Sequence, residues 1–377
     1  MTVALVHDSF TQLGGAERVV EALHEMFPQA PVFTLVFDRK LKAHYRAWDI
    51  RTSWLQVIYN FMPKFQWLFP IIPFAIGYLK FDGYDLVISS SSGFAKNITV
   101  PKNCLHINYC HTPTRFLWQS GDYVRQEVPA LLLPAAKLII TWLKKWDYRG
   151  AQRVRYFIAN SREVQTRISR YYKRASTIIE PFVNLDFWHQ TREKEDYFLL
   201  AGRLQAHKNN QPVIEVFNQL GLPLHVVGAG RQEKYLKSIA KSNISFLGKV
   251  SDERLRDEYS GATGFIFPQL EDFGLMPLEA AACGTASLAY GQGGALETVV
   301  PGQTGELFGV DNTGDLSLNN HNKLDNYKDQ LRQLILSWNP EKYSAAVLRS
   351  QAEKFCEEKF KTSFFAFIET VKHENCH

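Results

Sequence analysis

GFIFPQLEDFGLMPLEAAACGT, residues 264–285, reads as a strand, a loop and a helix in succession. The apolar run GFIFP is typical of a buried strand, and the helix is expected to begin near Met276. Glu271 lies in the loop just before this helix, and Glu279 lies within its first turns. A strand that leads through a short loop into a helix is the repeating unit of α/β domains with parallel sheets.

The start of this helix predicts a ligand site. The amides of Phe273, Gly274 and Leu275 lie at the helix entrance, where unpaired N–H groups and the positive end of the helix dipole favour an anion or sugar hydroxyls. Glu271 can accept from a sugar ring, and Glu279 can accept from a ribose. The pair therefore indicates a nucleotide-sugar site. The alternative is two solvated glutamates beside a helix cap.

Apolar strand-like runs alternate with helical periods along the rest of the chain, which favours parallel sheets covered on both faces. The strand-like runs lie at residues 3–7, 32–37, 85–91, 105–110, 156–160, 198–203, 224–230, 244–248, 264–268 and 286–290. The helix-like runs lie at residues 15–27, 210–220, 231–240, 251–260, 276–283 and 350–372.

The alternation breaks near residues 179–196 and then starts again. We therefore predict an α/β fold with two doubly wound, Rossmann-like domains that face each other across a cleft. The first would span residues 1–185 and the second residues 186–354, with a C-terminal helix at about 355–377 that packs back on the first. In such folds ligands bind at the carboxyl ends of the strands.

Several polar residues follow predicted strands at these ends. Gly15 opens the first helix, where a glycine lets backbone amides approach a ligand. Arg203 and Lys208 flank the loop of AGRLQAHKNN and could neutralise a diphosphate leaving group without a metal. His111 ends the strand LHINYC and could contact a sugar. The alternatives are a plain turn, two surface cations and a structural histidine.

Two residues after His111 are candidates for an acceptor pocket. Arg115 and Trp118 could line such a pocket, although Trp118 could equally belong to the core. In GQGGALETV, residues 291–299, simple turn chemistry is favoured over a phosphate contact. The sequence lacks a P-loop and GxSxG, and no Asp-x-Asp stands at a strand end. We therefore expect no metal site.

Composition is that of a globular protein. The chain has 377 residues, of which 45% are hydrophobic and 21% charged, and its net charge of +5 is too small to favour nucleic-acid binding. The five cysteines show no CxxC spacing, which predicts reduced thiols in a cytoplasm and no zinc site.

Two aromatic and basic segments are candidates for contact with a membrane surface. Residues 54–79 and 131–143 are apolar, but neither reaches the roughly 18 to 20 apolar residues of a membrane span. Such segments can lie in a bilayer interface. The alternative is a pair of helices buried against their own domain.

Taken together, the motifs resemble family 4 of the retaining glycosyltransferases, whose GT-B fold has two Rossmann-like domains. The resemblance covers nearly the whole chain. Its motifs are HDSF…GGAERV, YDLVISSSSGFAKN, YCHTPTRFLW, FIANSREVQTRI, AGRLQAHKN, VVGAGRQEKYL and EDFGLMPLEAAACGTASLAYGQGGALETV. The sequences GQGGALETV and HTPTRFLW are most similar to those of bacterial GDP-mannose-dependent mannosyltransferases of O-antigen and exopolysaccharide synthesis.

The resemblance implies roles for individual residues. The implied catalytic residues are Glu271, His111, Arg203 and Lys208, and the implied donor-binding residues are Gly15, Phe273, Gly274, Leu275 and Glu279. Glu271 would contact the donor sugar, Glu279 the ribose, and the two cations the diphosphate. The chain departs from a compact motif where Gln205, Ala206 and His207 separate these cations.

The resemblance also implies a reaction: retaining transfer of a sugar, α-mannose from GDP-mannose as first choice, to a lipid-linked saccharide acceptor. It implies no cofactor or metal, a cytoplasmic location that can include the inner-membrane surface, and no nucleic-acid partner. Three alternatives stay open. They are a transferase with a UDP-sugar donor, a nucleotide-sugar epimerase, and a catalytically silent partner in a polysaccharide complex.

Overall fold

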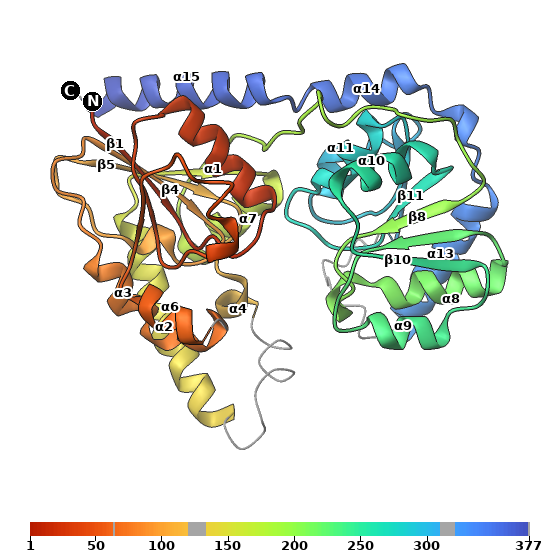
Figure 1. Ribbon diagram of the computed structural model, residues 1–377, viewed down its shortest axis with the longest axis horizontal. Helices are drawn as coiled ribbons and strands as arrows, with labels where there is room; N and C mark the ends of the chain where they lie inside the picture. The colour runs from red at the N-terminus through yellow and green to blue at the C-terminus, as the bar shows by residue number, and fades with distance from the viewer. Residues whose placement is uncertain (63–64, 120–132, 310–320, 376–377) are drawn as a thin grey trace. The chain divides into compact units, whose positions relative to one another are not determined.

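The computed structural model describes residues 1–62, 65–119, 133–309 and 321–375 (Figure 1). The chain divides into two compact units. The first is Met1–Glu180 together with Lys361–His377, and the second is Pro181–Phe360. The first boundary thus lies five residues before the predicted one, and the return to the first unit begins at Lys361 rather than near residue 355.

Within the described part of the first unit, seven parallel strands form one sheet in the order β3-β2-β1-β4-β5-β6-β7. The strands are β1 (Val3–His7), β2 (Val32–Thr34), β3 (Ile50–Thr52), β4 (Leu86–Ser91), β5 (Leu105–Cys110), β6 (Tyr156–Ala159) and β7 (Thr177–Ile178). The strands β3 and β7 were not predicted, because runs of three and two residues are too short to show a period.

The described part of the second unit contains a sheet of six parallel strands in the order β10-β9-β8-β11-β12-β13. The strands are β8 (Phe198–Ala201), β9 (Leu224–Val227), β10 (Ile244–Gly248), β11 (Gly264–Phe267), β12 (Ser287–Tyr290) and β13 (Gly305–Phe308). Both sheets have the Rossmann strand order. The chain first adds strands towards one side of the sheet and then continues on the other side, and the change lies between β1 and β4 in the first unit and between β8 and β11 in the second.

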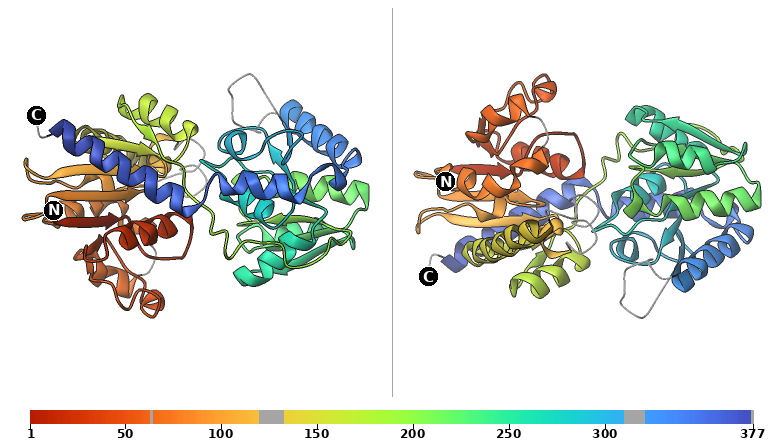
Figure 2. Two further views of the ribbon diagram at one scale, coloured as in Figure 1. Left: turned by 90° about the horizontal axis from the view of Figure 1, so that it is seen from above. Right: turned by 90° about the horizontal axis from the view of Figure 1, so that it is seen from below.

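Helices cover both faces of each sheet (Figure 2). In the first unit they are α1 (Gly15–Met26), α2 (Leu55–Phe61), α3 (Ile72–Tyr78), α4 (Arg115–Trp118), α6 (Leu133–Arg153) and α7 (Arg162–Tyr172). In the second they are α8 (Asn210–Leu220), α9 (Glu233–Ile239), α10 (Asp252–Gly261), α11 (Leu275–Ala282), α12 (Ala295–Thr298), α13 (His321–Leu336) and α14 (Ala345–Glu353). This arrangement confirms the predicted doubly wound fold.

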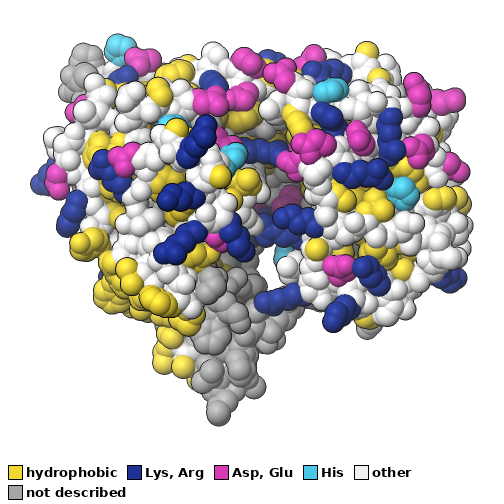
Figure 3. All heavy atoms as spheres, viewed as in Figure 1, with side chains coloured by type: hydrophobic (Ala, Val, Ile, Leu, Met, Phe, Trp, Pro, Cys, Tyr) yellow, Lys and Arg dark blue, Asp and Glu magenta, His cyan; other side chains and the backbone are white. Residues whose placement is uncertain are grey.

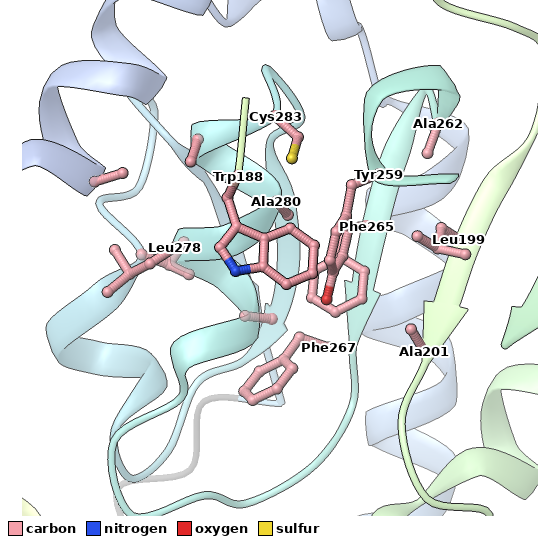
Figure 4. Close-up of a cluster of buried hydrophobic side chains, with 14 of the residues drawn as sticks. Trp188, Leu199, Ala201, Tyr259, Ala262, Phe265, Phe267, Leu278, Ala280 and Cys283 are labelled. Carbon is pink, nitrogen blue, oxygen red and sulfur yellow. The ribbon is translucent and has the colours of Figure 1, made fainter. Parts of the chain in front are cut away.

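The second unit has a separate apolar cluster on each face of its sheet. On one face, Tyr259 of α10 packs edge-on against Trp188 and Phe265, with ring centroids 5.7 and 5.1 Å apart (Figure 4). Leu278 of α11 belongs to the same cluster. This packing fixes α11, and with it the loop that carries Glu271, on the sheet.

The C-terminal tail forms two helices rather than the single predicted one. The chain leaves α14 at Glu353 and enters α15 (Glu357–Asn375). Between them the Phe355 carbonyl accepts from the Val183 amide at 2.8 Å, and a backbone contact to another segment replaces the helical bond there. From Lys361 onward α15 packs on the first unit, where Lys361 pairs with Glu25 and Phe365 contacts Phe27.

Candidate functional site

Two of the predicted residues, Lys208 and Glu271, lie together where the strand order of the second sheet changes direction, between β8 and β11. The loops after β8 and β11 leave neighbouring strands at the same edge of the sheet. There the Lys208 ammonium pairs with the Glu271 carboxylate. Lys208 is buried and Glu271 is partly exposed. A cation is therefore held by a carboxylate at the edge where Rossmann-like domains bind ligands.

The loop after β8 is shaped to orient Lys208. Residues 206–208 form a 3-10 turn, which contains Lys208 and the two residues before it. Asn209 follows in the left-handed conformation, with φ of 53°, and its side-chain amide donates to the Pro268 carbonyl at 3.0 Å. The Asn210 side chain donates to the Arg203 carbonyl at 3.2 Å. Arg203 is exposed on the same loop.

The loop after β11 presents the predicted amides. Gly274 precedes α11 with a φ of 88°, a conformation that favours glycine, and Leu275 is the first residue of the helix. The Phe273 side chain is buried and lies 5.5 Å from the Phe355 ring, so only its backbone is a candidate for ligand contact. Glu279 lies in the second turn of α11 and is buried.

The glycine-rich turn after β12 packs against the backbone of this loop. The Gly294 amide donates to the Glu271 carbonyl at 2.9 Å. A Cβ atom at Gly293 would lie 2.5 Å from the Glu271 carbonyl oxygen, and one at Gly294 would lie 2.1 Å from the Phe273 carbonyl oxygen. Gly293 and Gly294 are thus required for the close packing of these two loops.

We predict that Gly294→Ala weakens donor binding. The added Cβ cannot fit against the Phe273 carbonyl, so the loop at residues 271–274 must shift. A shift of about 1 Å in a positioning loop can cost on the order of 100-fold in rate. The test is a comparison of donor affinity and transfer rate with those of Gly77→Ala, where a Cβ would meet no atom within 4 Å. Equal values for wild type and Gly294→Ala would contradict the prediction.

In the first unit, His111 follows β5 and is buried. Its Nε2 atom lies 2.8 Å from the Ser90 hydroxyl. Burial, with a smaller effect from His7, lowers the pKa of His111 to about 3. His111 is therefore a neutral imidazole near pH 7, able to hydrogen-bond a sugar hydroxyl but not to supply positive charge.

A buried pair at the carboxyl end of β1 was not predicted from the sequence. His7 and Glu17 are both buried, with His7 Nε2 3.8 Å from Glu17 Oε1. His7 Nδ1 and Glu17 Oε2 have no hydrogen-bond partner within the described residues. The Glu17 carboxylate lies close to Gly14, because a Cβ there would be 3.1 Å from Glu17 Oε2. Glu17 was not singled out from the sequence, although it lies within the motif GGAERV.

Two buried histidines, His106 in β5 and His111 directly after it, predict a loss of stability in mild acid. Burial, then the charge of Arg153, lowers the pKa of His106 to about 3, as for His111. The unfolded chain binds these protons near the ordinary pKa of 6.5. Because the unfolded state takes up more protons, the free energy of unfolding falls as the pH drops from about 6.5 towards 3.

Each of these histidines contributes on the order of 1 kcal/mol per pH unit in that range. We expect a lower urea midpoint at about pH 5 than at about pH 7, and a smaller difference for His106→Asn. His373→Asn, which changes an exposed histidine, is the matched control. The same pH dependence in all three proteins would show that the buried histidine does not cause it.

The candidate acceptor residues differ in their surroundings. Arg115 is partly exposed at the start of α4. Trp118 donates from its indole N–H to the buried Asp147 carboxylate at 2.8 Å and stacks on Tyr171 at 5.2 Å. These contacts favour a structural role for Trp118, the second of the two interpretations of its sequence position.

Asp147 is the centre of a buried network that the sequence did not reveal. Its carboxylate pairs with the Lys96 ammonium at 2.6 Å, and both residues are almost completely buried. The side chains that donate to Asp147 are Lys96, Asn97, Thr114, Trp118 and Tyr172. The network joins α4, α6, α7 and the turn after β4.

None of the helices in the described part of the chain is both long enough and apolar enough to cross a membrane. No group of three or more His, Cys, Asp or Glu side chains in the described ranges is arranged to hold a metal ion.

Family models match most of the chain in two consecutive parts. Residues 13–187 match the model "Glycosyltransferase Family 4", and residues 184–333 match the model "Glycosyl transferases group 1". The first match spans most of the first unit, and the second match contains the Lys208–Glu271 pair.

Curated relatives match shorter segments. The O-antigen chain mannosyltransferase RfbU of Salmonella typhimurium is 27% identical over 148 residues, which are 36% of this chain and 42% of the relative. A GDP-mannose-dependent monoacylated alpha-(1-6)-phosphatidylinositol monomannoside mannosyltransferase of Corynebacterium glutamicum is 31% identical over 115 residues, 26% of this chain and 30% of the relative. The matches thus span less than half the length of these relatives.

Solved structures resemble the whole chain in fold. HepE of Anabaena, in complex with UDP-glucose, has a TM-score of 0.68 and 16% identity over 98% of this chain and 100% of that one. Sucrose-phosphate synthase of Thermosynechococcus elongatus has a TM-score of 0.68 and 14% identity over 99% of this chain and 100% of that one. At such identities the likeness establishes the fold alone.

Proposed function

Because this chain is a family 4 glycosyltransferase with the GT-B fold, we propose that it transfers an α-mannosyl residue from GDP-mannose to a lipid-linked saccharide with retention of configuration. The acceptor would belong to bacterial surface polysaccharide synthesis on the cytoplasmic side of the membrane. Two matched relatives named as mannosyltransferases support mannose as the sugar.

The observation that carries the proposal is the Lys208–Glu271 pair in front of α11. A nucleotide sugar divides into a diphosphate, which needs positive charge, and a sugar, which needs hydrogen-bond acceptors. Lys208 supplies the charge and Glu271 supplies carboxylate oxygens at the same edge of the sheet. The amides at the start of α11 supply donors for the phosphate or sugar oxygens.

Each residue then has a defined part in the transfer. As the bond from the sugar to the diphosphate breaks, negative charge grows on the leaving phosphate, and the positive charges of Lys208 and Arg203 stabilise it. Glu271 binds the hydroxyls of the sugar and keeps Lys208 in place. Glu279, in the second turn of α11, binds the ribose. We propose that the two cations make a metal ion unnecessary.

A thermal-shift titration with GDP, GDP-mannose, UDP-glucose and UDP-N-acetylglucosamine tests the proposal. A ligand that binds only the native state raises the apparent stability by mass action, by roughly 2.7 kcal/mol at a concentration of 100 times its Kd. We expect shifts with GDP and GDP-mannose alone. The same titration in the presence of EDTA should give the same shifts.

The other outcomes separate the alternatives. Shifts with the UDP compounds alone would replace mannose transfer with a UDP-sugar donor, a candidate that the fold likeness to the UDP-glucose complex of HepE keeps open. Conversion of a nucleotide sugar without any acceptor would favour an epimerase. Binding without turnover in the presence of bacterial lipid-linked saccharides would favour a silent partner.

A further inference from the structure

Exposed apolar side chains gather on one face of the first unit, at the lower left of Figure 3. We name this the α2–α3–α6 face after the helices that form it. Its main side chains are Val57, Phe61, Phe74, Tyr78, Leu138 and Trp142. The exposed fraction reaches 88% for Phe61, 74% for Leu138 and 65% for Phe74. Monomeric proteins rarely expose contiguous apolar patches of this kind unless something binds there.

The helices form one surface rather than separate spots. The Phe74 ring of α3 stacks beside the Trp142 ring of α6, with centroids 6.4 Å apart and planes at 29°. All residues of α6 are described, and its first buried residue is Leu143, ten residues after the helix begins. The leucines, isoleucines and tryptophan of the segment LPAAKLIITW are therefore all at least partly exposed to solvent.

The charge around this face has one sign. Residues 54–80 contain no aspartate or glutamate. In residues 133–153 the single acid is Asp147, which is buried and paired with Lys96. The cations of that segment are Lys137, Lys144, Lys145, Arg149 and Arg153. Exposed Lys137, Lys145 and Arg149 thus accompany the apolar side chains without an exposed acid in either segment.

An anionic lipid surface matches both properties of the face. The interface of a bilayer accepts aromatic and aliphatic side chains, and its anionic headgroups attract lysine and arginine. A second copy of the same face would bring like charges together. We propose that the α2–α3–α6 face docks on an anionic membrane surface, with Phe61, Phe74 and Trp142 inserted between lipids. The inference stands apart from the proposed reaction, because docking needs neither donor nor acceptor.

The test is co-sedimentation of the full chain with vesicles. One set is phosphatidylcholine, and the other contains about 30% phosphatidylglycerol. We expect the protein to bind the second set at low salt and to bind less at high salt. The variant Phe61→Ser/Phe74→Ser/Trp142→Ser should have an affinity for the anionic vesicles that is lower by about tenfold or more, since it lacks three exposed rings. Because these rings are exposed, the variant should unfold at nearly the same temperature as wild type.

Two control variants are compared with the triple variant, and both vesicle binding and dimer formation are measured. Leu336→Ser/Val347→Ser removes exposed apolar side chains from the second unit and should bind as wild type does. Lys137→Glu/Lys145→Glu should lose binding to the anionic vesicles. Wild-type protein that stays in the supernatant at low salt would overturn the inference, as would a triple variant that binds normally. A dimer that the triple variant abolishes, without vesicle binding, would instead identify a self-association surface and also overturn it.

Discussion

Replacing Glu271 with alanine is expected to abolish measurable sugar transfer while leaving the protein folded. The substitution removes the proposed contact to the sugar hydroxyls and also the carboxylate that holds Lys208. Loss of a single preorganised electrostatic contact typically reduces kcat by 100- to 1,000-fold. Here two contacts depend on one side chain, so we expect a loss at or beyond the upper end of that range.

The measurement is the initial rate of GDP release from GDP-mannose in the presence of lipid-linked saccharides extracted from bacterial membranes. Glu341→Ala is the matched control, since Glu341 is an exposed carboxylate elsewhere in the second unit. Glu341→Ala should unfold close to the wild-type temperature. Glu271→Ala leaves the buried Lys208 ammonium without this carboxylate, so it should unfold at a lower temperature but remain folded under the assay conditions. Full activity of Glu271→Ala would show that the carboxylate has no part in transfer.

The substitution Asp147→Ala is expected to cost the most stability. It leaves the Lys96 ammonium buried without its counter-ion, and five side chains lose an acceptor. Breaking a buried ion pair by removing one partner typically costs about 3–5 kcal/mol. Urea unfolding measures this loss. The control is Asp49→Ala, which breaks the exposed pair with Arg51 and should cost less than about 1 kcal/mol.

A milder variant covers the case in which Asp147→Ala does not fold. Trp118→Phe removes one donor to the Asp147 carboxylate and keeps most of the ring contact with Tyr171. A hydrogen bond to a charged group contributes about 1.5–3 kcal/mol. A loss of that size without a change in the KM for the acceptor would support a structural Trp118. Unchanged stability with a raised acceptor KM would support the acceptor-pocket interpretation instead.

The sequence predicted the secondary structure well where strands are long and apolar. The runs at 3–7, 105–110 and 244–248 match β1, β5 and β10 residue for residue. The break between the tail helices was not predicted, because it depends on a backbone contact between Phe355 and Val183. Nothing in the local composition near residue 354 signals a partner 172 residues earlier in the chain.

Part of the candidate site could be predicted from the sequence. Glu271 and Lys208 could be assigned to one edge because parallel strands end at a common edge. Asp147 could not be recognised, because it lies between basic and aromatic residues and its partner Lys96 is 51 residues away. The His7–Glu17 pair likewise depends on how α1 packs beside the end of β1, which spacing alone does not determine.

The central claim is that the loops after β8 and β11 bind the diphosphate and sugar of a nucleotide sugar. Calorimetric titration of wild type and Lys208→Met with GDP tests it most directly. The account predicts saturable binding to wild type and an affinity for Lys208→Met that is lower by about tenfold or more, since one charge-assisted contact is lost. Equal affinities of the two proteins for GDP would contradict it.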